Sequence, residues 1–242
     1  MGRTADADDV RRATRQGLAV ALATSAYGIS FGALGVASGL DVWQTCVLSL
    51  LMFTGGSQFA FVGVIAAGGL AAAPAAIASS ALLGVRNVAY GMRMSPVVGG
   101  GFWRKALAAP FTIDESTAVA LAQTQPRARM WGFWVTGIGI YLGWNLSTLL
   151  GALLGDVLGD PRAYGLDAAA AAAFLALLWP RLRGCQAIAV GVAAAVVATV
   201  LTPALMPGVP VLLAAVVALV VGWFNWWDRP AGARPPHRES SE

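Results

Sequence analysis

Three groups of polar residues interrupt otherwise apolar parts of the sequence, and their residue types could bind a charged molecule. The first group is residues 53–59 (FTGGSQF), in the middle of an apolar run. The second begins with Arg86 and Asn87, and the third is residues 112–117 (TIDEST). A polar or charged side chain among apolar residues is costly unless it is paired, so each group needs a structural or functional reason.

Residues 53–59 predict a broken helix. Glycine is unfavourable inside a helix and serine is a good N-cap, so we expect Ser57 to cap a new helix that starts near Gln58. A helix start exposes backbone N–H groups with partial positive charge, which several transporter folds use to hold a carboxylate. The alternative is a continuous, flexed helix in which Gly55 and Gly56 admit a neighbouring helix.

The charged residues of the other two groups each allow two interpretations. Arg86 could bind a carboxylate, either of a substrate or of the acidic pair Asp114 and Glu115, or its side chain could extend to a membrane surface. Thr112 and Glu115 have the spacing of a capping box, which is typical of a helix start at a surface. Alternatively, Asp114 or Glu115 faces an internal cavity, where lost hydration favours the protonated carboxyl group and lets it carry protons.

Together the three groups supply the contacts that a zwitterion needs. Arg86 or the start of a half-helix could bind the carboxylate, and Asp114 or Glu115 could bind the ammonium group. An apolar pocket could be lined by Phe53, Phe59 and Phe61. The predicted substrate-binding residues are Phe53, Gly55, Gly56, Ser57, Gln58, Phe59, Arg86 and Tyr90. The predicted proton-coupling residues are Asp114 and Glu115.

The composition indicates that lipid surrounds most of the chain. Of the 242 residues, 57% are hydrophobic and 12% are charged, whereas soluble domains carry about 25% charged residues. The few charges are concentrated in the two ends of the chain, 1–16 and 228–242. We therefore predict a transmembrane permease domain at 17–227 between two cytoplasmic tails at 1–16 and 228–242.

The apolar runs set the number of membrane segments. Crossing a bilayer takes roughly 20 helical residues. Runs of suitable length lie at 17–40, 43–69, 71–98, 131–155, 166–180, 185–203 and 209–227, with a weaker one at 106–125. The first run is too long for a cleaved signal peptide. We predict an all-α polytopic transmembrane bundle of six to eight segments with at least one broken helix.

Two arrangements satisfy this range. We favour eight segments, in which 106–125 crosses the membrane. In the six-segment alternative one of the first three runs is re-entrant and 106–125 is cytoplasmic or half-inserted. Basic and non-basic loops alternate in the second half of the chain, which predicts that both termini are cytoplasmic. Glycines at four-residue spacing, such as Gly28 with Gly32 and Gly151 with Gly155, predict close helix packing.

Several classes of protein find no support. The basic residues form no patch that could follow a nucleic acid. Cys46 and Cys185 lie in apolar runs without metal-ligand spacing, and the single histidine is His237 in the tail, so we expect no metal and no cofactor. An intramembrane enzyme would need a nucleophile with a base, or paired aspartates, at membrane depth.

A channel or membrane assembly scaffold remains an alternative, and it would need no ionisable residue inside the bundle.

The chain resembles the AzlC family, the large subunit of branched-chain amino acid exporters, over roughly residues 17–180. The resemblance is carried by Tyr27-Gly28, Phe31-Gly32, residues 53–59, Arg86 with Tyr90 and Pro96, Thr112 with Asp114-Glu115, Trp144 with Thr148 and Gly151, and Gly165-Leu166-Asp167 before Phe174.

This resemblance implies a function and a partner. The expected activity is export of leucine, isoleucine, valine or similar amino acids across the cytoplasmic membrane of a bacterium, driven by the membrane potential or a proton gradient. A separate small hydrophobic subunit of the AzlD type is the implied partner, since no such region is fused here. The resemblance assigns working roles to Gln58, Arg86, Asp114 and Glu115.

Overall fold

The computed structural model of the protein describes residues 2–158, 175, 178–179, 182–205 and 209–224. Every regular element in these ranges is a helix, as the sequence predicted. The predicted run at 166–180 lies almost wholly outside the described residues, and the predicted tail at 228–242 lies outside them entirely.

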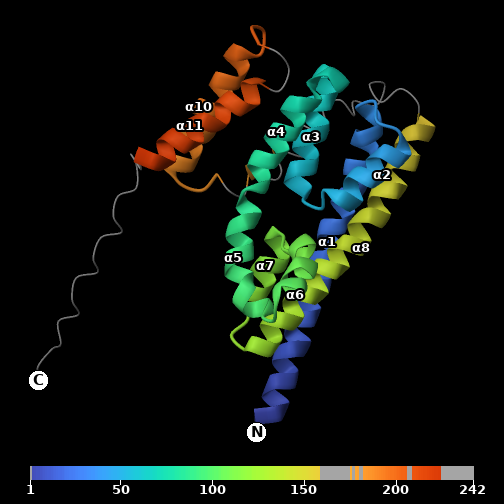
Figure 1. The fold of residues 1–242 in the computed structure, drawn as a ribbon, viewed down its shortest axis with the longest axis vertical. Helices are drawn as coiled ribbons and strands as arrows, with labels where there is room; N and C mark the ends of the chain where they lie inside the picture. Colours follow the sequence, from blue (N-terminus) through green and yellow to red (C-terminus); the bar gives the residue numbers. More distant parts are fainter. Residues whose placement is uncertain (1, 159–174, 176–177, 180–181, 206–208, 225–242) are drawn as a thin grey trace, which may run out of the picture.

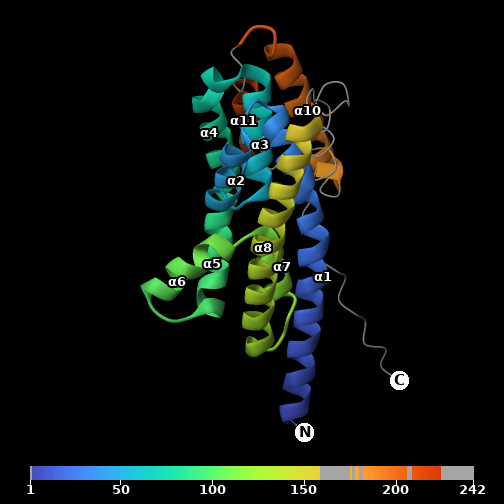
Figure 2. The same ribbon diagram turned by 90° about the vertical axis from the view of Figure 1, so that its right-hand side faces the viewer.

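Two long helices run side by side through the molecule (Figure 2). They are α1 (Gly2–Ala37) and α8 (Pro126–Leu158), and each is about 50 Å long at 1.5 Å per residue. Among the described residues, their segments Asp6–Ala37 and Pro126–Val157 are long and apolar enough to cross a bilayer. Helix α1 also includes most of the predicted N-terminal tail.

Glycines let the backbones of α1 and α8 touch. A Cβ atom on Gly28 would lie 2.8 Å from the backbone oxygen of Trp144, and one on Gly32 would overlap the backbone oxygen of Thr148. On α8, Gly155 faces the backbone of Ala33 on α1. Residue numbers increase together along the two helices, so the pair is parallel. The predicted role of the glycine spacing in close packing is confirmed.

The run at 43–69 is broken into two shorter helices, α2 (Val42–Leu51) and α3 (Gly55–Gly68). Both lie in the upper half of the molecule in Figure 1. The predicted break is therefore present, but the predicted cap is wrong. Thr54 is the N-cap residue of α3, and Ser57 lies inside the helix.

The chain then descends through two helices that are nearly continuous. After a short 3-10 turn, η1 (Leu70–Ala72), α4 (Ala73–Gly84) is followed by α5 (Arg86–Val98). Val85 between them keeps helical dihedral angles, and its N–H donates to carbonyl oxygens of α4. The change of helix falls immediately before Arg86.

The predicted weak segment at 106–125 contains only short helices. Helix α6 (Phe102–Ala108) leads through η2 (Ala109–Phe111) to α7 (Asp114–Leu121). With 8 residues, α7 is about 12 Å long, so it cannot cross a hydrocarbon core of about 30 Å. The described part of 106–125 therefore gives no support to a full crossing by α7 alone, which the eight-segment arrangement requires.

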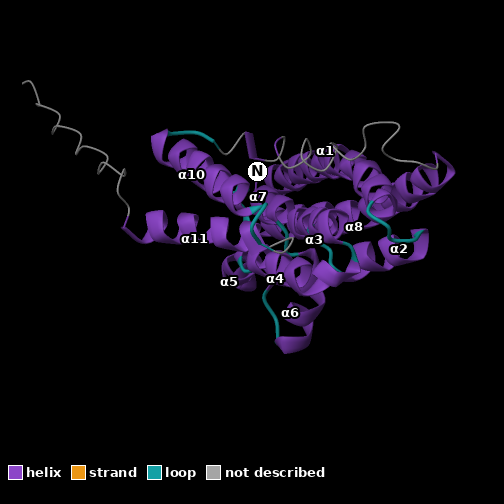
Figure 3. Cartoon of the chain, turned by 90° about the horizontal axis from the view of Figure 1, so that it is seen from above, coloured by secondary structure: helices purple, strands orange, loops and turns teal. Residues whose placement is uncertain are grey.

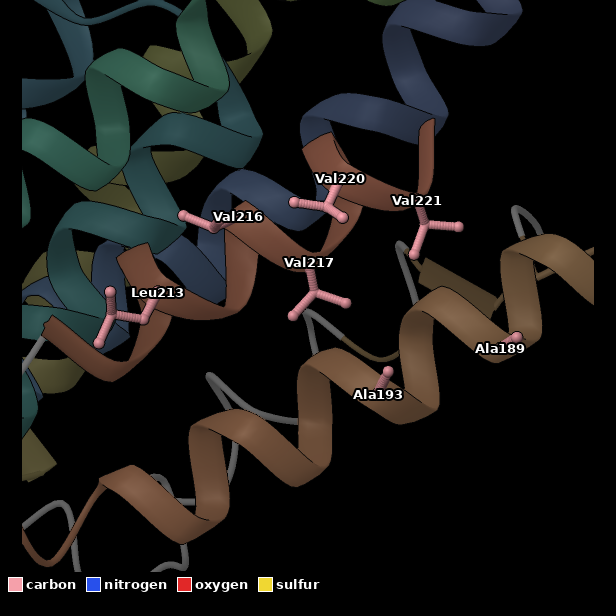
Figure 4. A pocket seen from close by; sticks show the side chains of 7 residues that line it. All are labelled: Ala189, Ala193, Leu213, Val216, Val217, Val220 and Val221. Atoms are coloured by element: carbon pink, nitrogen blue, oxygen red, sulfur yellow. The ribbon is translucent and has the colours of Figure 1, made fainter. Parts of the chain in front are cut away.

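Helices α10 (Cys185–Leu201) and α11 (Val209–Phe224) form a separate pair beside the main bundle. Figure 3 shows this pair extending to one side of α1 and α8, and α11 contacts α4. An apolar groove of about 400 Å³ lies between α10 and α11 (Figure 4). It is lined by Ala189, Ala193, Leu213, Val216, Val217, Val220 and Val221. This aliphatic lining offers no partner for a charged ligand.

Candidate functional site

The start of α3 forms one wall of the candidate site. Thr54 has an extended backbone conformation, and its side chain makes no capping hydrogen bond. The first hydrogen bond of the helix joins the Gln58 N–H to the Thr54 carbonyl oxygen at 3.0 Å. The N–H groups of Gly55 and Gly56 precede that bond, so they are among the donors that a helix leaves without an intrahelical partner. This helix end carries partial positive charge.

The side chain of Arg86 lies against this helix start. A Cβ atom added to Gly56 would be 2.9 Å from Arg86 Nη2 and 3.6 Å from its Cζ. Only a residue without a side chain leaves room for the guanidinium group in this position. The two glycines in residues 53–59 thus have a specific structural reason, beyond the break in the helix.

Asp114 pairs with Arg86. The distance between Arg86 Nη1 and Asp114 Oδ2 is 3.0 Å, and the two side chains are 25% and 21% exposed. Asp114 is the first residue of α7, where the positive end of the helix favours a carboxylate. Arg86 therefore sits in an ion pair inside the molecule, and the interpretation that its side chain extends to a surface is wrong.

The predicted capping box at Thr112 and Glu115 is also wrong, although a helix does begin here. Thr112 Oγ1 donates to the carbonyl oxygen of Ala108 at 2.9 Å. The N-cap residue of α7 is Ile113, whose N–H donates to Ser116 Oγ at 3.1 Å. Since Ser116 performs the capping, neither acidic residue is needed as the capping side chain. Asp114 is instead held in the ion pair.

Two polar side chains on α3 are fully buried behind the helix start. Ser57 Oγ donates to the carbonyl oxygen of Ser80 at 2.9 Å and so connects α3 to α4. Gln58 Nε2 donates to the carbonyl oxygen of Ser49 at 3.3 Å and connects α3 to α2. The other polar atom of Gln58, Oε1, is buried without a hydrogen-bond partner. Ser57 therefore positions α3, while Gln58 has an unused acceptor.

The predicted aromatic residues occupy different environments. Phe59 is 1% exposed, and its ring centroid lies 5.7 Å from that of Phe31 and 6.3 Å from that of Trp144. Its ring thus belongs to the packed core behind the site. Phe53 is half-buried, and its ring packs edge-on against Tyr141 with centroids 4.9 Å apart. Phe53 is the better placed of the two to border an accessible space.

The remaining predicted residues lie close to the ion pair along the chain. Tyr90 is half-buried and one turn beyond Arg86 on α5, and Glu115 is half-buried and follows Asp114 on α7. Their helical positions keep both residues near the pair. The structure thus brings all three polar groups of the sequence to one place, where α3, α5 and α7 begin.

Sequence reasoning did not include Trp144 and Thr117 among the site residues. The Trp144 ring faces Gly55, with its Cη2 atom 3.4 Å from where a Cβ would lie. Thr117 is one turn beyond Asp114 on α7. Trp144 Nε1 and Thr117 Oγ1 are both buried without a hydrogen-bond partner, as is Arg86 Nε. The signal of Trp144 in the sequence was weak, because it is one aromatic residue in a long apolar run.

The residues of this arrangement can bind charged groups. Arg86 places a cation at the positive end of α3, and Asp114 places a carboxylate beside it. Both signs of charge are therefore available within a few ångströms. No group of three or more His, Cys, Asp or Glu residues that could hold a metal ion occurs in the described part of the chain. The site therefore suits a small ligand with charged groups.

An all-helical chain with long apolar helices and a charged pair at helix breaks has the features of membrane transporters. Residues 19–158 match the family model described as AzlC protein, and this match covers more than half of the chain. The chain belongs to the AzlC family, a transport-associated family that is generally linked to branched-chain amino acids and is not an enzyme family. No curated protein and no solved structure matches the chain.

The family match contains every residue of the candidate site. It ends at the C-terminal end of α8, so the resemblance noted at Gly165-Leu166-Asp167 and Phe174 lies beyond it and outside the described residues. Family membership and the apolar helices together indicate a membrane protein.

Proposed function

We propose that this protein is a permease that exports branched-chain or related hydrophobic amino acids. The observation that supports this most directly is the Arg86–Asp114 ion pair beside the start of α3. Free amino acids carry one carboxylate and one ammonium group, and this site holds one partner for each. A channel or scaffold has no need for an ionisable pair inside the bundle, where each charge is costly.

The apolar part of the substrate suits the surroundings of the pair. Phe53 and Tyr141 form a half-buried aromatic wall, and the core behind the site consists of Phe31, Phe59 and Trp144. A branched aliphatic side chain loses contact with water at such a wall, which contributes about 25 cal/mol per Å² of apolar surface buried. Leucine, isoleucine and valine gain more from this contact than glycine or serine does.

We further propose that the protein lies in the cytoplasmic membrane of a bacterium with both termini in the cytoplasm, and that it works with a small AzlD-type subunit. The first turn of α8 contains Arg127 and Arg129, and Arg127 pairs with Asp6 near the N-terminus, with 3.3 Å between Nη1 and Oδ2. The basic N-terminal residues and these two arginines then face the cytoplasm, as the positive-inside rule favours. Exposed apolar side chains on several helices suit contact with lipid or with such a subunit.

Proton coupling is the part of this proposal that depends on the acidic pair, Asp114 and Glu115. Both carboxyl groups lie at the start of α7, inside the bundle, where a change of protonation alters the charge of the site. Glu115→Gln is the simplest variant that tests coupling, because it keeps the Arg86–Asp114 pair. We expect this variant to keep leucine counterflow while losing its response to a proton gradient. A retained response would remove Glu115 from the coupling path.

The function is tested by efflux of radiolabelled leucine and valine from proteoliposomes that contain this chain, with and without a co-reconstituted small subunit. We expect both amino acids to leave faster than from empty liposomes, and lysine and glutamate to leave at the background rate. The small subunit should raise the rate. If leucine and valine are not moved under either condition, the proposed substrate class is wrong.

A further inference from the structure

We propose that a free α-amino acid binds by inserting its two charges between Arg86 and Asp114. Its carboxylate replaces Asp114 as the partner of Arg86, and its ammonium group replaces Arg86 as the partner of Asp114. This inference rests on the proposed function and adds how the substrate is recognised. It also names the molecules that the site rejects, which are hydrophobic compounds with only one of the two charges.

Without a ligand, Arg86 and Asp114 pair with each other. The two charged groups contact each other at 3.0 Å and remain 25% and 21% exposed, so a ligand can reach them. Around them Gln58, Thr117 and Trp144 are almost fully buried. Separating charges in such surroundings without replacing each partner is strongly unfavourable, because it leaves an uncompensated charge away from bulk water.

Charge balance favours a ligand that carries both charges. An amino acid zwitterion replaces one ion pair by two, and no charge is left without a partner. A monocarboxylate of the same shape would compensate Arg86 but place a second negative group beside Asp114 without supplying a cation to replace Arg86. An amino acid amide would compensate Asp114 but leave Arg86 alone. The closed pair therefore opens at low cost only for a ligand that carries both charges.

The position of Arg86 beside α3 fixes the orientation of the ligand. The guanidinium group of Arg86 lies over Gly56 at the start of α3, and its Nε atom is buried without a partner. A carboxylate bound to Arg86 can thus also approach the N–H groups at the positive end of α3. The buried, unpartnered Nε1 atom of Trp144, whose ring faces Gly55, adds a further unused donor on this wall.

One consequence concerns the empty site. When the ligand leaves, Arg86 and Asp114 pair with each other again, so the empty site also carries no uncompensated charge. The protein can then change conformation without a ligand, which permits net export as well as exchange of one amino acid for another.

The test is ligand binding by isothermal titration to the purified full-length protein in nanodiscs. The probes are L-leucine, L-leucinamide, which has only the ammonium group, and 4-methylpentanoate, which has only the carboxylate. We expect wild-type protein to bind leucine at least about 10-fold more tightly than either analogue, equal to about 1.4 kcal/mol. Arg93→Gln, at an exposed position on α5, is the control and should show the same order.

Two variants then test the insertion itself. Asp114→Asn leaves Arg86 without its partner, so 4-methylpentanoate should bind more tightly than to wild type and leucine more weakly. Arg86→Gln leaves Asp114 without its partner, so leucinamide should gain affinity instead. Arg86→Lys and Asp114→Glu keep both charges and should keep the preference for leucine. These opposite gains are specific to charge exchange, because a folding defect would weaken all three ligands.

The outcomes separate this inference from the proposed function. If wild-type protein binds all three ligands equally, insertion is wrong while an exporter of hydrophobic compounds remains possible. If Asp114→Asn weakens leucine and 4-methylpentanoate alike, insertion is also wrong. If wild-type protein does not bind leucine at all, both the inference and the proposed function fail. Should Asp114→Asn not fold, the comparison of the three ligands on wild-type protein decides alone.

Discussion

Arg86 of α5 and Asp114 of α7 form an ion pair, 3.0 Å between Nη1 and Oδ2, at the point where α3 begins. The pair joins two segments that sequence analysis identified separately, and the contact of Arg86 with Gly56 adds the third.

Gly56→Ala should displace Arg86 from the start of α3. The new Cβ would lie 2.9 Å from Nη2, closer than such contacts occur, so the guanidinium group must move. We expect leucine efflux to fall about 10-fold or more, as a displacement of about 1 Å at a binding site can cost even more. Gly91→Ala on α5 is a matched control, because a Cβ there meets nothing within 4 Å. Equal rates for the two variants would contradict the role of Gly56.

Gly32→Ala should destabilise the protein by separating α1 from α8. The added methyl group would overlap the backbone at Thr148 and Ala152, and neither backbone can move without shifting a whole helix. Overpacking of this kind costs about 1–3 kcal/mol. Thermal unfolding in detergent should show a lower midpoint than wild type, whereas Gly91→Ala should stay near the wild-type value. An unchanged midpoint for Gly32→Ala would show that α1 and α8 are not packed this closely.

Ser57→Ala should weaken the connection between α3 and α4. The hydroxyl group donates to the Ser80 carbonyl oxygen inside the protein, and losing such a bond costs about 1 kcal/mol. We expect a small fall in the unfolding midpoint. Thr199→Ala removes a hydroxyl group that bonds only within α10 at an exposed position, so it should have no such effect. A Ser57→Ala variant as stable as Thr199→Ala would argue against this link.

Arg86 and Asp114 should show energetic coupling in a double-mutant cycle. The pair is partly exposed, so its coupling energy should lie between those of exposed and buried pairs, at about 1–3 kcal/mol. The cycle consists of Arg86→Gln, Asp114→Asn and the double variant, measured by chemical denaturation. Additive effects of the two single variants would mean that the ion pair does not contribute to stability.

The sequence allowed the three polar groups to be identified, because each is conspicuous in an apolar run. It also allowed a helix break within residues 53–59 and the close packing of glycine-containing helices to be predicted from local rules, although the new helix was expected near Gln58 and begins at Gly55. An acidic partner for Arg86 was one of the alternatives that the sequence left open, whereas its contact with Gly56 was not predicted. Nothing local to Arg86 indicates that it contacts Gly56 and Asp114, since those contacts depend on how α3, α5 and α7 meet.

Local capping rules failed where more than one residue could cap the start of a helix. Ser57 and Thr54 are both reasonable N-cap residues, and the helix begins one turn earlier than the serine suggested. At α7 the capping oxygen comes from Ser116, not from Glu115. The Ser57 hydroxyl is used in a tertiary hydrogen bond to Ser80, and the Thr112 hydroxyl is used in a local hydrogen bond to Ala108.

The central claim is that Arg86 is the charge on which amino acid transport depends. It is tested most directly by efflux of radiolabelled leucine from proteoliposomes that contain wild-type protein, Arg86→Gln or Arg93→Gln at equal amounts. The two arginines lie on the same helix, but Arg93 is exposed and makes no ion pair among the described residues. We expect Arg86→Gln to reduce efflux to the rate of empty liposomes and Arg93→Gln to retain wild-type efflux. Wild-type efflux from Arg86→Gln would contradict the account.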